Sequence, residues 1–200
     1  EAGDFTFLFV GNINLEEAKP FIETYLGGLP TINRKENFKD IKMDIRKGAH
    51  KNVFEKQMET PKATVFSVIS GNCKFTPKNN LLMSMFSQIM DMVYIETIRE
   101  KEGASYGVTT YGEMSCYPKE EAIFQIIFDT DPAKREKMEQ IVMAELQKVA
   151  KEGPRPEHLA KVKEYMLKKH LENVKENNYW VNQLLEYYFN NIDLYTGYEK

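Results

Sequence analysis

The residues of this chain with the clearest capacity for chemistry lie in one segment, residues 98–108, which reads IREKEGASYGV. Arg99 and Tyr106 are seven positions apart, at the end of a helical pattern and the start of a strand-like pattern. A guanidinium donates hydrogen bonds in a fixed fork, and a phenol both donates and accepts them. From the two sides of one helix-to-strand turn, both groups can address the same backbone carbonyl of a bound peptide. Binding of a peptide backbone is therefore one chemistry that this segment could perform.

Structural roles explain the same residue types. An arginine in the last turn of a helix interacts favourably with the negative end of the helix dipole, by about 0.3–1 kcal/mol, and a tyrosine in a strand is commonly a core residue. Gly103 suits a left-handed helix stop, and Gly107 would allow another backbone to approach closely. Both glycines fit either interpretation, so residue types alone leave the alternatives open.

The elements that must position this segment are a long helix and an antiparallel sheet. Thr76 and Pro77 are typical helix-start residues, and an apolar stripe at three- and four-residue spacing follows up to Gly103. That stripe consists of Leu82, Met85, Phe86, Ile89, Met92, Val93, Ile95 and Ile98. Strand patterns occupy residues 6–10, 53–58, 63–70, 105–111 and 122–129, and further helical patterns occupy residues 15–26, 131–151, 157–175 and 177–188.

This order of elements predicts an α+β fold in which an antiparallel sheet of about four to five strands packs against a layer of helices. Residues 31–46 show no hydrophobic period and follow a Gly-Gly-Leu-Pro break, so they are expected to form a linker.

Composition narrows the class of partner. A net charge of −3, with 27 basic and 30 acidic residues interspersed, argues against nucleic-acid binding. No continuous apolar run approaches the roughly 20 residues that span a bilayer, so no membrane partner is expected. Cys73 and Cys116 are too few for a disulfide framework and are expected to be ordinary half-buried thiols.

The segment at 99–106 resembles the R-E-K-x-G-x-x-Y stretch in the non-catalytic half of the pitrilysin- and insulysin-like zinc peptidases, the inverzincins. Two further stretches, residues 9–12 (FVGN) and 25–30 (YLGGLP), are similar to the family's domain-closing sequence. The resemblance implies a metallopeptidase sandwich that is incomplete at both ends. Residues 1–30 would be the closing strand and helix of a preceding domain, and residues 47–200 a final domain truncated at its carboxyl end.

This resemblance also implies a function. The chain would be the substrate-binding, non-catalytic portion of a zinc-dependent metalloendopeptidase, with Arg99 and Tyr106 binding substrate and Gly103 and Gly107 supporting them. Its partners would be a peptide substrate and an H-x-x-E-H catalytic half, in the same chain or in a partner subunit, which would hold the zinc. The alternative is a catalytically silent structural or assembly subunit of the same family.

The histidines do not provide a metal site of their own. His50, His158 and His170 are the only ones, and none begins an H-x-x-E-H motif. His158 and His170 are twelve positions apart, too far for adjacent turns of one helix. We expect no zinc in this chain and no catalytic residue, with the three histidines solvated or locally hydrogen-bonded.

Overall fold

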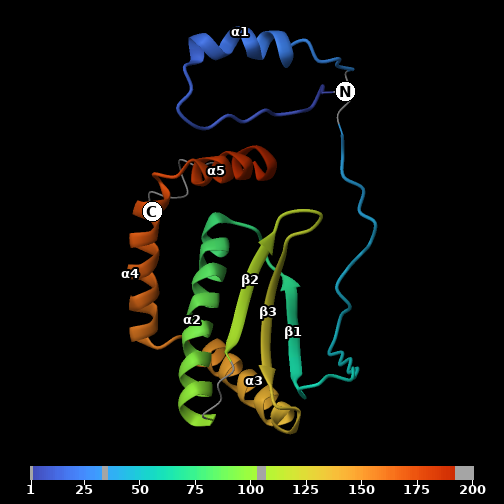
Figure 1. Cartoon of the computed structure of the whole chain (residues 1–200), viewed down its shortest axis with the longest axis vertical. Coiled ribbons are helices and arrows are strands. Elements are labelled where there is room, and N and C mark those ends of the chain that lie inside the picture. The colour runs from blue at the N-terminus through green and yellow to red at the C-terminus, as the bar shows by residue number, and fades with distance from the viewer. Residues whose placement is uncertain (1, 33–35, 103–106, 192–200) are drawn as a thin grey trace. The chain divides into compact units, whose positions relative to one another are not determined.

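The computed structural model describes residues 2–32, 36–102 and 107–191 (Figure 1). Two compact units are distinguished, one comprising residues 1–41 with 167–200 and the other residues 42–166. The first contains α1 (Leu15–Tyr25) and α5 (Asn177–Asn190). The second contains β1 (Ala63–Asn72), α2 (Pro77–Glu102), β2 (Val108–Ser115), β3 (Glu121–Thr130), the short 3₁₀ helix η1 (Pro132–Lys134) and α3 (Arg135–Glu152). Helix α4 (Pro156–Asn173) begins in the second unit.

The sheet is antiparallel, with β3 between β1 and β2. Figure 1 shows α2 running along β2. Because side chains alternate across a sheet, Val108, Ile126 and Phe128 form a buried face on the side of the helices. The opposite face leaves Phe66 and Tyr111 exposed. One covered and one open face is the usual arrangement of an antiparallel sheet in an α+β fold, which confirms the predicted fold class.

The strand count is lower than predicted, because the described residues form three strands and not four or five. Residues 53–58 and 6–10, both predicted as strands, are irregular. Phe54 is 86% exposed and Phe9 is 56% exposed. A strand is stable only with a hydrogen-bonded neighbour, and no described residue pairs with either segment. The predicted strand at 105–111 is also shifted, since β2 begins at Val108 and continues to Ser115.

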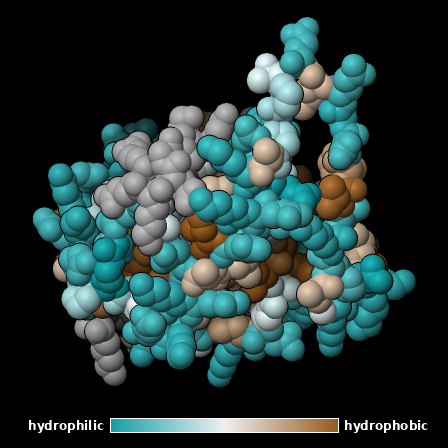
Figure 2. All heavy atoms as spheres, turned by 90° about the horizontal axis from the view of Figure 1, so that it is seen from below, coloured by the Kyte–Doolittle hydropathy of each residue, from teal (hydrophilic) through white to brown (hydrophobic). Residues whose placement is uncertain are grey.

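Helix α2 supplies much of the core. Met90 and Tyr94 are fully buried, whereas Leu82 and Ile95, expected in the buried stripe, are about half exposed. The face that meets the sheet follows residues 86, 89–90, 93–94 and 97–98, and Leu82 and Ile95 lie off it. Figure 2 shows apolar atoms in brown in the middle of one face of the molecule, between hydrophilic ones.

The segment Pro77–Ile98 is long and apolar enough to cross a membrane by length and composition, contrary to the expectation from its sequence. Several of these apolar residues pack in the core of the domain. Ile89, Val93 and Ile98 belong to the core cluster shared with the sheet and with α3. Here α2 is therefore the central helix of a packed core.

Two helix starts follow the expected chemistry. The side chain of Asn14 accepts a hydrogen bond from the backbone N–H of Glu16 at 3.1 Å and caps α1. The Oδ1 atom of Asp131 accepts one from the N–H of Ala133 at 2.8 Å. After Asp131 the first turn is the 3₁₀ helix η1, and α3 begins at Arg135.

Candidate peptide-binding site at the end of helix α2

Of the four predicted site residues, the structure describes Gly107 and the backbone of Arg99. Arg99 belongs to the last turns of α2, but its side chain lies outside the described part of the chain. Gly103 and Tyr106 lie outside the described residues. Gly107 immediately precedes β2 and is exposed, and no described atom comes within 4 Å of the point where a Cβ would lie. What the structure defines is the pair of elements that enter and leave the turn.

On the strand side, Thr110 anchors β2 to α2. Its backbone N–H donates to Oδ1 of Asp91 at 2.8 Å. Its hydroxyl lies 2.9 Å from the same carboxylate oxygen and 3.0 Å from the carbonyl oxygen of Ser87. Thr110 is 8% exposed, so these bonds are largely shielded from water. They fix the strand four positions after Tyr106.

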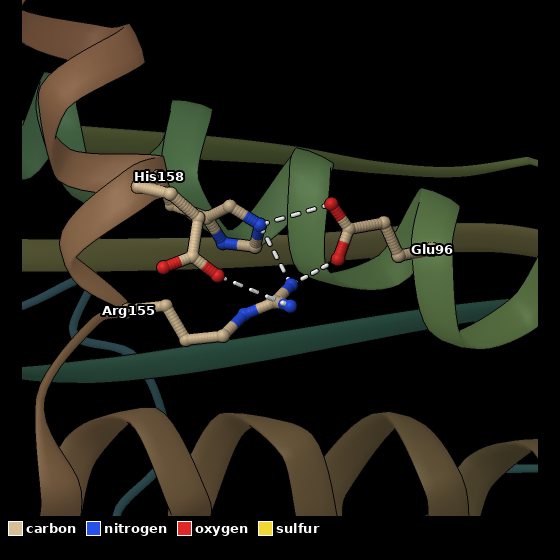
Figure 3. A network of polar contacts seen from close by, with 4 residues as sticks. Glu96, Arg155 and His158 are labelled. Carbon is tan, nitrogen blue, oxygen red and sulfur yellow. Dashed lines mark hydrogen bonds and ion pairs between the residues drawn. The ribbon is translucent and has the colours of Figure 1, made fainter.

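On the helix side, three residues form a polar network (Figure 3). Glu96 projects from α2, Arg155 lies in the connection between α3 and α4, and His158 lies in the first turn of α4. Nη2 of Arg155 pairs with Oε2 of Glu96, and Nε2 of His158 lies 3.0 Å from Oε1 of the same carboxylate. The network joins α2 to the start of α4 one turn before Arg99.

The two side chains that contact Glu96 differ in burial. The His158 side chain is completely buried, whereas those of Arg155 and Glu96 are 53% and 37% exposed. Nε2 of His158 is also 2.6 Å from Nη2 of Arg155. A guanidinium only donates, so Nε2 serves either Glu96 as a donor or Arg155 as an acceptor, one at a time. Nδ1 of His158 has no hydrogen-bond partner among the described atoms.

The hydrogen bond from Arg155 holds the pKa of Glu96 below its usual range, and Glu96 in turn raises the pKa of Arg155. Because both side chains are more than a third exposed, the pair contributes at most about 1 kcal/mol to folding stability. Its main effect is to set the ionisation and direction of one carboxylate on α2.

The described residues offer no metal centre, since no group of three or more His, Cys, Asp or Glu side chains in them could hold an ion. A groove lined by both polar and apolar residues lies beside the network, and its lining includes Val93, Thr97, Lys148 and Gly153 together with Glu96 and Arg155. It contains no nucleophile activated by a neighbouring base in the described part of the chain.

Sequence reasoning missed the network. His158 is expected from the sequence to be solvated or locally hydrogen-bonded. It is buried and not solvated, and besides its local contact with Arg155 it faces Glu96, 62 positions away in the chain. No local pattern signals such a pair. The two cysteines match expectation, since among the described residues neither Cys73 nor Cys116 forms a disulfide and both are partly buried.

The family model described as "Peptidase M16 inactive domain" matches residues 1–166. The chain belongs to this family. It is similar to a "Zinc protease PQQL-like" of Arabidopsis thaliana, with 23% identity over 96% of this chain and 21% of that protein. The M16 inactive domain described here therefore spans about a fifth of the length of this relative.

Two crystal structures share the fold of this M16 inactive domain. The periplasmic protease PqqL from Escherichia coli aligns over 88% of this chain and 19% of its own, with a TM-score of 0.70 and 16% identity. A peptidase M16 inactive domain from Pseudomonas fluorescens aligns over 68% of this chain and 32% of its own, with a TM-score of 0.56 and 21% identity. The resemblance found in the sequence is confirmed: the chain is a non-catalytic domain of a zinc protease family.

Proposed function

We propose that this M16 inactive domain is the substrate-binding wall of a zinc-dependent metalloendopeptidase. Arg99 and Tyr106 hold the backbone of a peptide, and a zinc-bound water on an H-x-x-E-H half attacks it. That half lies in the same chain or in a partner subunit. Residues 1–30 close a preceding domain, residues 31–46 are the linker, and residues 47–200 belong to the final domain.

The observation that carries this proposal is the pair of anchors around residues 99–106. The network at Glu96 fixes α2 three positions before Arg99, and the bonds of Thr110 fix β2 four positions after Tyr106. Anchoring the elements on both sides of a binding segment reduces the entropy lost when a peptide binds.

Kinetics of the full-length protein test the role of Arg99. Arg99→Ala should lower kcat/KM for peptides by about tenfold or more, since a hydrogen bond to a charged donor is worth about 1.5–3 kcal/mol. Arg99→Lys should rescue the activity poorly, because the planar fork is lost. Zinc content and folding should not change in either variant.

The matched control is Arg46→Ala, which removes an exposed arginine from the irregular segment before β1. If Arg99→Ala and Arg46→Ala both retain wild-type kinetics, Arg99 is a helix-end charge and the proposed binding role is wrong. If the full-length protein lacks H-x-x-E-H and has no peptidase activity, the silent assembly subunit becomes the better account.

A second experiment uses the 200-residue chain alone. Purified and supplied with zinc, it should not hydrolyse unstructured peptides, because its sequence lacks the H-x-x-E-H ligand pair and the glutamate between them. The measurement is release of fluorescent product with and without a chelator. Cleavage that a chelator abolishes would contradict the non-catalytic assignment.

A further inference from the structure

We infer that β1 pairs with β1 of a second copy of this chain, so that two three-stranded sheets join into one continuous antiparallel sheet. β1 is an outer strand next to β3, and no described residue pairs with its free edge (Figure 1). The free edge of a strand presents backbone N–H and C=O groups that a further strand can bind. The order of side chains along β1 points to a second copy as that further strand.

The free edge of β1 lacks the features that usually prevent pairing. Its ten residues, ATVFSVISGN, include no charged residue and no proline. Phe66 is 57% exposed and Val68 is 42% exposed, and no described atom lies within 4 Å of the would-be Cβ of Gly71. Residues 42–62 lead into β1 but form no backbone hydrogen bond with it in the part of the chain that the structure describes. The edge is therefore accessible to another strand.

The side chains of β1 follow nearly the same order in both directions from its middle. From Ser67 outward, the corresponding positions are Phe66 and Val68, Val65 and Ile69, and Thr64 and Ser70. Two antiparallel copies related by a twofold axis at Ser67 would therefore place an aromatic ring beside a β-branched residue, two β-branched residues together and two hydroxyls together. Cross-strand pairs of these kinds stabilise antiparallel strands. A twofold interface requires a surface that is complementary to itself, and β1 provides one.

The same pairing extends the open face of the sheet. Phe66 lies opposite Ile127 of β3, and Val68 lies opposite Gln125. In the joined sheet Phe66 would in addition contact Val68 of the second copy, and these side chains would lose exposed apolar surface. The interface consists of one strand edge and a few side chains, so we expect a reversible dimer whose population rises with concentration.

Analytical ultracentrifugation of the full-length protein tests this pairing with two matched double variants. Phe66→Lys/Val68→Lys places a lysine opposite a lysine on both sides of the twofold axis. It should weaken dimerisation by about tenfold or more, because like charges directly opposite destabilise a strand pair. Phe66→Lys/Val68→Glu changes the same exposed positions but places each lysine opposite a glutamate, so it should dimerise about tenfold more tightly than the first variant.

The control is Thr109→Lys/Tyr111→Lys. Thr109 and Tyr111 are exposed at the same spacing on β2, at the opposite edge of the sheet, and their replacement adds the same charge as the first variant. This control should dimerise as wild type does. Circular dichroism of all variants checks that each is folded.

Hydrogen exchange of the wild-type protein locates the interface without any substitution. Backbone amides in residues 63–72 should exchange more slowly as the protein concentration rises, and those of β2 should not change. The inference is overturned if the full-length protein stays monomeric at its highest soluble concentration, or if both variants at positions 66 and 68 dimerise as wild type does. A dimer that gives β1 no additional protection would also overturn it, because its interface would lie elsewhere.

Discussion

At the scale of single residues, the ionisation of Glu96 connects stability with the site. Its pKa lies below the usual range because Arg155 donates to it. A carboxyl group whose pKa is lower in the folded state stabilises the fold above its unfolded pKa, about 4.3, and that contribution is lost as pH falls through the folded pKa. The network therefore makes this helix contact sensitive to acid.

We expect Glu96→Gln to reduce the loss of stability on acidification. The wild-type chain should lose up to about 1 kcal/mol more free energy of unfolding than the variant between pH 7 and pH 3, a small value because the pair is partly exposed. Urea denaturation at both values of pH measures the difference. Glu164→Gln, at an exposed position of α4, is the control; equal acid sensitivity in wild type, variant and control would contradict the assignment.

The sequence alone predicts the position of Arg99 along its helix. The apolar helical pattern ends at Ile98 and Gly103 follows four positions after Arg99, so the neighbouring residues predict that Arg99 lies near the end of α2. Glu96 and His158 are brought together only by the packing of α4 on α2, and neither residue type indicates a partner 62 positions away. Pairs of this kind require the tertiary structure.

At the scale of elements, Gly112 sets how closely α2 approaches β2. A Cβ at this position would lie 2.5 Å from Oγ of Ser87 and 2.7 Å from Sδ of Met83. Only the absence of a side chain allows the helix to lie this near the strand.

Gly112→Ala should destabilise the chain by about 1–3 kcal/mol, because an added methyl group in a packed interface forces the helix or Met83 to shift. Gly71→Ala is the matched control: Gly71 is also in a strand, but no described atom lies within 4 Å of its would-be Cβ. Thermal unfolding of both variants measures the effect. Equal melting temperatures would show that α2 adjusts without cost.

Helices were more predictable than strands for a physical reason. A helix satisfies its backbone hydrogen bonds internally, so caps such as Asn14 and an apolar period suffice to predict it. A strand depends on a neighbour. Residues 63–70 and 122–129 lie in β1 and β3, which pair with each other. The similar patterns at 6–10 and 53–58 pair with no strand among the described residues.

At the scale of the whole molecule, the buried core lies within one unit. Every residue of the core cluster, from Ile89 to Val162, falls in residues 42–166. The described residues among 1–41 include none that is buried. Residues 1–41 should therefore contribute little to the stability of the core.

Deleting residues 1–41 should leave cooperative unfolding and shift the melting temperature by no more than a few degrees, because the main apolar cluster is retained. Near-ultraviolet circular dichroism follows the packing of Tyr94 and its neighbours. A variant that loses this signal, or that unfolds without a cooperative transition, would show that the first 41 residues are part of the folding unit.

The central claim is that the turn between α2 and β2 binds a peptide backbone, and affinity tests it most directly. The measurement is the Kd of the full-length protein for a peptide that it cannot cleave, compared among wild type, Arg99→Ala and Arg46→Ala by calorimetry. We predict that Arg99→Ala weakens binding about tenfold or more and that Arg46→Ala binds as wild type does. Equal affinity of all three proteins would contradict the claim.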